Sequence, residues 1–449
     1  MNKKNVSMKV VNQDAAGIDV GSRSHFVATG QDPSDVYEFG VYNEDLENLA
    51  ALLHSKGIRT VAMESTGTYW QNLYAILRSS GFEVILCNGK FTKNVKGRKS
   101  DVQDCQWIQK LHSLGLLTGS FLPDEVTENL RTYCRHRTNL IELAADTTLK
   151  MQKYLRLLNV RLDVIVRDVT GLTGLSIIEA ICNGENDPEK LASHRNGNCK
   201  TPQSEMVKAL QSNGRKDYLF TLNHEYQMYL TIQSKIRECD LAIEKMLHDH
   251  ISENDSKREH YIERKTHKRV SKNTPKNIDI NLMSYQYFEG VDLLAIEGVS
   301  HSTVLAIMSE IGHGIHKFPT AKQFTSWLRL SPNNKISGGR ILSHKVPKGS
   351  NRLKIALRQA ANAIGNLKNT GLSNFFRRIA FRKGRPAAIS ATARKLAVII
   401  WNMIIKKTPY KPQTEYEFTD QKRKRKVLEV KRLIQKFDIT SNDLGLSTS

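Results

Sequence analysis

Short apolar runs alternate with helical patterns over residues 15–120. Apolar runs bounded by turn residues predict strands, whereas apolar residues spaced three and four apart predict helices. A tight turn, Gly21-Ser-Arg-Ser24, separates the first two apolar runs. We therefore expect strands at 15–20, 25–29, 36–42, 60–63 and 83–87, and helices at 44–54, 69–79 and from about Asp101.

The order of these elements indicates an α/β fold. Three consecutive strands followed by alternating helices and strands is the order of a ribonuclease-H-like domain. In such a sheet the first strand is central and the later strand lies beside it. We expect this domain over residues 1–120.

A long helical region follows from Asp124. Its apolar residues alternate spacings of three and four, which is the heptad spacing of coiled coils. We expect two long helices within residues 121–251, in an antiparallel pair or an intermolecular coiled coil, with ordinary packing against one core as the alternative. Residues 170–222 form an insertion between them, with loops at 183–188 and 195–198. The seams are Leu130, Tyr133, Arg137, Leu140, Ala144, Thr147, Met151, Tyr154 and Leu158, then Tyr229, Ile232, Ile236, Cys239, Ile243 and Met246.

Two further segments are polar and basic. Residues 252–285 are predicted to be a basic linker or a mobile nucleic-acid arm, and ordered structure is expected to resume near Leu293 in a domain over 286–410. A basic tail, 411–449, carries Lys422-Arg-Lys-Arg-Lys426 and a short helix. The basic residues of the linker are Lys257, Arg258, Arg264, Lys265, Lys268, Arg269, Lys272 and Lys276.

The charge balance favours a polyanionic partner. The 449 residues include 67 Lys and Arg against 45 Asp and Glu, a net charge of +22. Neutralising phosphates releases condensed counterions, so a clustered basic surplus points to nucleic acid, although a generally basic surface is the alternative. The six cysteines contain no CxxC pair, which argues against a zinc site or a disulfide framework. No stretch of about 18 apolar residues occurs, and we expect a cytoplasmic protein without membrane contact.

Four acidic residues occupy positions suited to a metal site. Asp19 and Glu64 lie near the ends of predicted strands, and Asp101 and Asp104 share one face of a predicted helix. Four carboxylates that converge repel one another unless cations neutralise them. Oxygen ligands select Mg²⁺ or Mn²⁺, and two such ions suit phosphodiester cleavage. Taken singly, each acid has another explanation, as a cap, a turn residue or a complement to the helix dipole.

The C-terminal region carries a candidate phosphate-binding element and a candidate nucleophile. Residues 293–308 have the pattern of a helix, a glycine turn and a second helix, which resembles a helix-hairpin-helix; such elements also serve as scaffolding. A loop rich in glycine, serine and lysine then leads into a helix at 351–364. It contains Ser337, an exposed hydroxyl followed by two glycines, to which spacing alone gives little weight.

Basic and aromatic residues are interleaved in the same region, which suits nucleic-acid binding. The aromatic residues are Phe375, Phe376 and Phe381, and Arg394 and Lys395 extend the basic pattern. The residues expected to contact nucleic acid are Lys335, Arg340, Lys345, Lys348, Arg352, Arg377, Arg378, Arg382, Lys383 and Arg385.

These motifs resemble the DEDD-type transposases of insertion sequences, the IS110 group. The resemblance rests on Gly17-Ile-Asp19, Met63-Glu-Ser-Thr-Gly-Thr-Tyr69, Lys99-Ser-Asp-Val-Gln-Asp104, the hairpin at Ile296-Glu-Gly-Val299 with residues 324–332, and Ser337-Gly-Gly. It covers roughly 15–120 and 290–410. It implies a RuvC-like N-terminal domain that binds metal through Asp19, Glu64, Asp101 and Asp104, and a mostly helical C-terminal transposase domain.

The resemblance also implies the chemistry and the partners. Ser337 would attack DNA and form a covalent phosphoserine intermediate during cleavage and rejoining. The partners would be donor and target DNA, a noncoding RNA from the end of the element that pairs with both, and further copies of the chain, as a dimer or tetramer joined through the coiled coil. Residues 170–222 and 252–280 look like expansions of the simpler middle region of this family, and Ser343 is the second candidate nucleophile if the loop aligns differently.

Two other functions compete with this reading. A RuvC-like nuclease for branched DNA would use the same carboxylates with water as the nucleophile. A nucleic-acid-binding scaffold on an inactive nuclease fold is the non-enzymatic alternative, and the complete acidic quartet argues against it.

Overall fold

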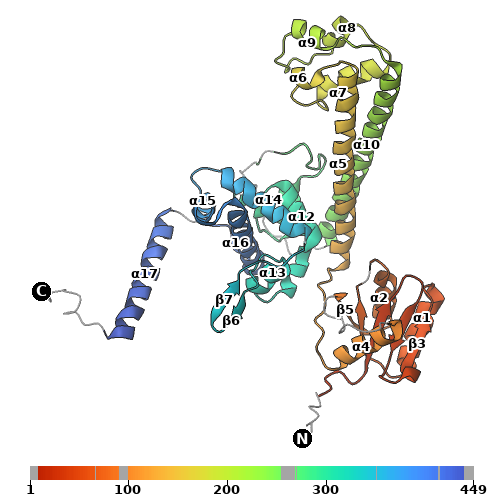
Figure 1. The fold of residues 1–449 in the computed structure, drawn as a ribbon, viewed down its shortest axis with the longest axis vertical. Coiled ribbons are helices and arrows are strands. Elements are labelled where there is room, and N and C mark those ends of the chain that lie inside the picture. Colours follow the sequence, from red (N-terminus) through yellow and green to blue (C-terminus); the bar gives the residue numbers. More distant parts are fainter. Residues whose placement is uncertain are drawn as a thin grey trace, which may run out of the picture. The chain divides into compact units, whose positions relative to one another are not determined.

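The computed structural model describes residues 9–65, 67–89, 100–253, 268, 270–349, 351–412 and 415–438. The chain divides into two compact units, Met1–Leu122 and Pro123–Ser449. The N-terminal unit is a mixed α/β domain and the C-terminal unit is mostly helical (Figure 1).

The N-terminal unit is built on one five-stranded sheet in the order β3-β2-β1-β4-β5. Strand β2 is antiparallel to β1 and β3, whereas β4 is parallel to β1 and β5. The predicted elements are confirmed to within a few residues, and the third strand shows the largest difference because it ends at Phe39. The elements are β1 (Ala15–Val20), β2 (His25–Ala28), η1 (Pro33–Asp35), β3 (Val36–Phe39), α1 (Asn43–Ser55), β4 (Thr60–Glu64), α2 (Trp70–Ser79), β5 (Glu83–Cys87) and α4 (Asp101–Ser113).

Helices cover both faces of this sheet. The buried leucines of α1 and α2 pack with Ile18 and Met63, which lie on one face of β1 and β4. On the other face, Ile108 of α4 packs with Ala62 and Cys87. Successive strand residues point to opposite faces, so α1 and α2 cover one side of the sheet and α4 covers the other.

Two long helices begin the C-terminal unit. α5 (Glu125–Leu157) and α10 (Lys216–Glu253) pack side by side (Figure 1). They are antiparallel, because Arg137 pairs with Asp240 while the later residue Lys150 pairs with the earlier residue Glu225. Of the predicted arrangements, the structure shows the antiparallel pair of helices within one chain. The predicted seam is wrong at Tyr133, which is 41% exposed, because Cys134 is the buried residue there.

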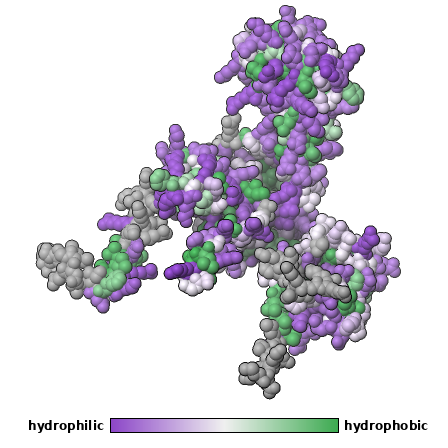
Figure 2. Space-filling model, in the orientation of Figure 1, coloured by the Kyte–Doolittle hydropathy of each residue, from purple (hydrophilic) through white to green (hydrophobic). Residues whose placement is uncertain are grey.

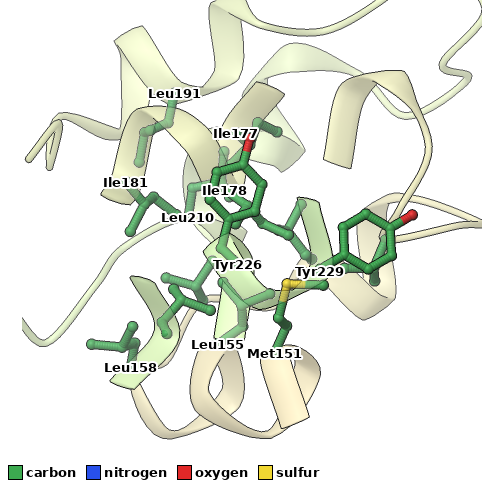
Figure 3. Close-up of a cluster of buried hydrophobic side chains, with 14 of the residues drawn as sticks. Met151, Leu155, Leu158, Ile177, Ile178, Ile181, Leu191, Leu210, Tyr226 and Tyr229 are labelled. Atoms are coloured by element: carbon green, nitrogen blue, oxygen red, sulfur yellow. The ribbon is translucent and has the colours of Figure 1, made fainter. Parts of the chain in front are cut away.

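The insertion between the two helices has a core of its own. Four short helices, α6 (Leu162–Ile165), α7 (Leu172–Cys182), α8 (Pro188–Ser193) and α9 (Gln203–Ala209), gather at the end of the helical pair. Their buried side chains pack with Met151, Leu155 and Tyr226 from α5 and α10 (Figure 3). The predicted loops are turns between these helices.

A buried ion pair fixes the register of α5 against α10, and its removal is the first testable prediction. Arg137 and Asp240 have side chains only 7% and 5% exposed. Arg137→Met leaves a carboxylate buried without its partner and should lower the free energy of unfolding by about 3–5 kcal/mol. Lys150→Met, which removes the exposed pair with Glu225, should cost less than about 1 kcal/mol. Urea unfolding of both variants measures the difference, and equal losses would contradict the assignment.

The rest of the C-terminal unit is a cluster of helices with one hairpin. The first helix after residue 270 is α11, which lies earlier than Leu293, and the predicted helix at 293 is a single 3-10 turn. The elements are α11 (Ile280–Tyr287), η3 (Leu293–Ala295), α12 (His301–Glu310), η4 (Gly312–Lys317), α13 (Ala321–Trp327), β6 (Lys335–Ser337), β7 (Arg340–Ser343), α14 (Arg352–Asn366), α15 (Gly371–Lys383), α16 (Arg385–Lys406) and α17 (Glu415–Phe437).

The described part of the predicted basic linker is bound to the folded unit. Lys268 donates to the carbonyl oxygens of Ile296 and Val299 at 2.5 and 2.6 Å, and Lys272 lies 2.6 Å from the Asp168 carboxylate. The sequence predicts a linker or a mobile arm here. In the structure, instead, these two lysines bind carbonyl and carboxylate oxygens of the folded unit. Lys257, Arg258, Arg264, Lys265 and Arg269 lie outside the described residues.

Helix α16 is the core helix of this cluster. Among the described residues it is the one helix long and apolar enough to cross a membrane. It packs against α13, α14 and α15. This packing accounts for its apolar composition.

Candidate nucleic-acid cleavage site

Asp19 and Glu64 lie side by side at the ends of two neighbouring strands. The parallel register of β1 and β4 pairs Ile18 with Met63. The residues that follow them, Asp19 and Glu64, are therefore neighbours too. Adjacent strands lie about 4.8 Å apart, and registered residues point to the same face. Both carboxylates are half-buried. The register therefore brings together two of the predicted site residues.

Helix α4 brings the other two acids to the same edge of the sheet. Its last turn lies at the start of the strands, because His112 Nε2 is 2.9 Å from the Thr60 hydroxyl. Its first turn, with Asp101 and Asp104, therefore lies toward the strand ends that carry Asp19 and Glu64. Asp104 is half-buried and Asp101 is exposed, with Ser100 capping the helix.

The pKa values of two buried thiols reflect the negative charge at this edge. Burial, together with the nearby carboxylates of Asp19 and Asp104, raises the pKa of Cys105 to about 12. Burial and the carboxylate of Glu64 likewise raise the pKa of Cys87 to about 12. Three of the four acids therefore lie near thiols at this end of the sheet.

The acidic edge offers oxygen ligands, and the resemblance of the motifs implies a divalent cation there. Among the described residues, no group of three or more His, Cys, Asp and Glu is close enough to hold one metal ion. The donor set nevertheless fits a hard cation: carboxylates are its only charged ligands, and the neighbouring thiols are buried in their protonated form. An incoming cation would reduce the repulsion among these carboxylates.

The close approach of α4 depends on Gly17, and this gives a second prediction. A Cβ at Gly17 would lie 2.1 Å from the backbone nitrogen of Gln109 and 2.6 Å from the Cys105 oxygen. Gly17→Ala must displace α4 and should cost about 3 kcal/mol or more in a thermal melt. Gly119→Ala is the matched control, since its Cβ meets only Ile85 Cγ2 at 3.4 Å. Similar stability in both variants would show that α4 is not seated on β1.

Buried histidines predict acid sensitivity of the N-terminal unit. Burial lowers the pKa of His112 and of His25. Below about pH 6.5 the unfolded chain protonates these groups while the folded chain resists protonation, so the free energy of unfolding should fall as the pH falls. Chemical unfolding between pH 7.5 and about 5 tests this expectation. His112→Gln should reduce the slope, and an unchanged slope would contradict the assignment to His112.

Ser337 lies in a β-hairpin, where the sequence predicts a loop. β6 and β7 pair antiparallel, with Ser337 directly opposite Arg340. Gly338 and Gly339 form the two-residue turn with φ of 53° and 74°, a conformation that glycine adopts without strain. Directly opposed residues have Cβ atoms about 5 Å apart, so Ser337 and Arg340 lie on the same face of the hairpin.

The second candidate nucleophile, Ser343, is placed differently. It lies at the base of the hairpin, opposite Lys335, and its hydroxyl accepts a hydrogen bond from the Lys345 backbone at 3.3 Å. Ser337 is exposed next to the turn. The hairpin geometry therefore favours Ser337.

The predicted nucleic-acid residues are mostly exposed on the same cluster of helices. Some of them also donate hydrogen bonds within this cluster, among them Arg385 to the side chains of Asn362 and Asn366 and Arg377 to the Leu367 carbonyl. Phe376 is buried and cannot stack on a base, whereas Phe381 is 93% exposed. All ten predicted basic residues are exposed: Lys335, Arg340, Lys345, Lys348, Arg352, Arg377, Arg378, Arg382, Lys383 and Arg385.

One further feature was missed in the sequence pattern. Residues 311–414 contain 21 Lys and Arg and no Asp or Glu. The carboxylate that ends α12 just before this run, Glu310, is bound by Arg131 and Arg135. A count of charge along the chain would have found this acid-free run, which accounts for almost all of the net charge of +22.

Comparisons with known proteins match both halves of this arrangement. Residues 16–160 match the DEDD family model of the IS110 group, described as a transposase, and residues 292–376 match the transposase IS116/IS110/IS902 family. A probable family 20 transposase of Pseudomonas aeruginosa is 28% identical over 124 residues, which are 27% of this chain. The match spans 36% of the length of that relative. The first matched region includes the four acids of the acidic edge, and the second includes the β6–β7 hairpin.

Proposed function

This chain belongs to the IS110 family of transposases, and from that premise we propose that it cuts and rejoins DNA through a covalent link to Ser337. The observation that carries the proposal is the register of β1 and β4, which sets Asp19 beside Glu64 on the face that α4 covers. The strand order, with β4 and β5 parallel to β1, supports a RuvC-like, ribonuclease-H-like assignment for the N-terminal domain.

Asp19, Glu64, Asp101 and Asp104 would hold Mg²⁺ or Mn²⁺, with two ions as the proposed number. Bound ions would polarise the scissile phosphate and stabilise the leaving oxygen. Two contacts between α4 and β1 position these carboxylates. Gly17 has no side chain and lets α4 pack closely against β1, and Gln109 of α4 donates a hydrogen bond to the Ala15 carbonyl at 3.1 Å.

The Ser337 hydroxyl would form the new bond to phosphorus while the bond to the 3′ oxygen breaks. The proton lost by Ser337 balances the proton gained by the 3′ oxygen. Arg340 would hold the phosphate opposite the attacking hydroxyl. Attack by a 3′ hydroxyl on the phosphoserine then rejoins DNA and regenerates Ser337, so no external energy source is required.

The acid-free run supports nucleic acid as the partner of the C-terminal domain. Donor and target DNA are the proposed substrates, and a reaction on chromosomal DNA would take place in the cytoplasm. Guidance by an RNA from the element remains a prediction, tested by adding the transcript of the element's end to the purified reaction.

Assembly into a dimer or tetramer is also a proposal. The seams of α5 and α10 face each other, so other copies would have to use the outer faces of this pair. Exposed apolar residues on those faces include Leu143, Leu149, Met228 and Leu241. The proposed domain boundaries are 1–120, 121–251, 252–285, 286–410 and 411–449.

Strand transfer between two plasmids tests the function. One plasmid carries the element with its flanking DNA and the other carries the target, and the purified chain is added with Mg²⁺ and the transcript. Joined products that disappear with a chelator support the proposal. Cleaved but unjoined DNA would favour the nuclease that uses water, and binding without cleavage would favour the scaffold.

A further inference from the structure

The β6–β7 hairpin exposes three apolar side chains, two of which share one face. Ile336 and Ile341 are opposed across the two strands and are 62% and 48% exposed, and Leu342, beside the irregular register at Lys335, is 69% exposed. Single exposed apolar residues are ordinary on a protein surface, but three together on so short an element call for a partner. A two-stranded hairpin is also marginally stable by itself in water.

The base of the hairpin is held while its tip projects. Asn333 donates to the Lys345 carbonyl at 3.1 Å, and Arg329 donates to the Lys348 carbonyl at 2.7 Å. Beyond these contacts, β6 and β7 pack chiefly against each other among the described elements. In Figure 1 the hairpin extends from the cluster of helices, and Figure 2 shows hydrophobic surface beside hydrophilic surface at this place.

The surrounding charge identifies the class of partner. The hairpin lies within residues 311–414, which have no carboxylate side chain, and Lys335, Arg340 and Lys345 lie in or next to its strands. A polyanion with an apolar interior between its charges fits this surface. Duplex DNA has this composition, because stacked bases lie between two rows of phosphates. Two-stranded ribbons fit its major groove, and apolar wedges can part its base steps.

The two faces of the hairpin are spaced to act together. Successive residues of a strand alternate in direction and advance about 3.4 Å, which is also about the rise of one base pair along the axis of duplex DNA. The apolar pair of Ile336 and Ile341 therefore precedes the polar pair of Ser337 and Arg340 by one residue, on the opposite face.

We infer that the apolar face of the hairpin inserts between two base pairs next to the phosphate that Ser337 attacks. Unstacking that step opens the backbone and turns the phosphate toward the Ser337 hydroxyl. The inference rests on the proposed function, because it assumes that Ser337 acts on duplex DNA.

The test measures unstacking without chemistry. The full-length Ser337→Ala protein is mixed with a duplex that carries one end of the element with its flanking DNA, with 2-aminopurine placed at successive positions across the boundary. One position should show a rise in fluorescence of about threefold or more on binding. Ile336→Thr with Ile341→Thr keeps the β-branched shape of both residues and should remove most of the rise, while DNA affinity stays within about twofold because the phosphate contacts remain.

Ile355→Thr is the matched control, since Ile355 is 44% exposed on α14 in the same acid-free run, and it should leave the fluorescence rise intact. A rise that persists in the double variant would overturn the inference. So would a double variant that dissociates from oligomer to monomer in sedimentation and retains the rise, because a second copy would then cover this face. Failure of the proposed function appears separately, as a covalent adduct that survives Ser337→Ala.

Discussion

Asparagine in place of Asp19 is expected to reduce DNA strand cleavage on the order of a thousandfold while leaving DNA binding intact. Asp19 lies near the end of the central strand β1 beside Glu64, so the amide of an asparagine there would supply one neutral oxygen where the site needs a charged ligand. The same change relieves repulsion among the carboxylates, so the thermal stability without metal should stay constant or rise. Cleavage of labelled DNA, together with Mn²⁺ titration, measures both effects.

Asp14→Asn is the matched control for this prediction. Asp14 precedes β1 at the opposite edge of the sheet and forms an exposed ion pair with Arg59 at 3.5 Å. Its replacement removes the same charge from the same unit and should change neither cleavage nor Mn²⁺ affinity. Unaltered cleavage in Asp19→Asn would exclude the acidic edge as the site of chemistry.

The strands of the N-terminal domain could be predicted from the sequence because their apolar runs are bounded by turn residues. Ala15–Val20 and Glu83–Cys87 agree with the structure at both ends. The pairing of Asp19 with Glu64 depends on the register of β1 and β4, and register is set by tertiary contacts such as the packing of α4 on Gly17.

The differences also have physical causes. Tyr133 fits the heptad spacing as well as Cys134 does, but its phenol can remain in water while the smaller thiol fits between two close helices. The glycine pair after Ser337 is compatible with a flexible loop, but two glycines between short strands also predict a tight hairpin. The strands there have only three and four residues, too few to show a period.

The hairpin, by contrast with a loop, fixes which side chains share a face. Ser337 faces Arg340, and Ile336 faces Ile341. A hydroxyl held opposite a guanidinium is suited to a phosphate, because the guanidinium offers paired donors in a fixed plane. The chemistry proposed for Ser337 thus depends on the two-residue turn.

Ser337→Ala is expected to abolish the covalent protein–DNA adduct and to reduce strand transfer by about four orders of magnitude or more. The methyl group cannot attack phosphorus, and the exposed position of Ser337 means that its loss leaves the hairpin folded. Labelled DNA that migrates with the denatured protein measures the adduct, and filter binding measures retained affinity.

Ser343→Ala separates the two candidate nucleophiles within one hairpin. The Ser343 hydroxyl accepts the Lys345 amide, so its removal should weaken the base of the hairpin slightly and leave the adduct in place. Loss of the adduct in Ser343→Ala alone would transfer the nucleophile to that residue. An adduct absent from the unmodified protein, with cleavage intact, would instead identify water as the attacking group, and the acidic edge would then act without the hairpin.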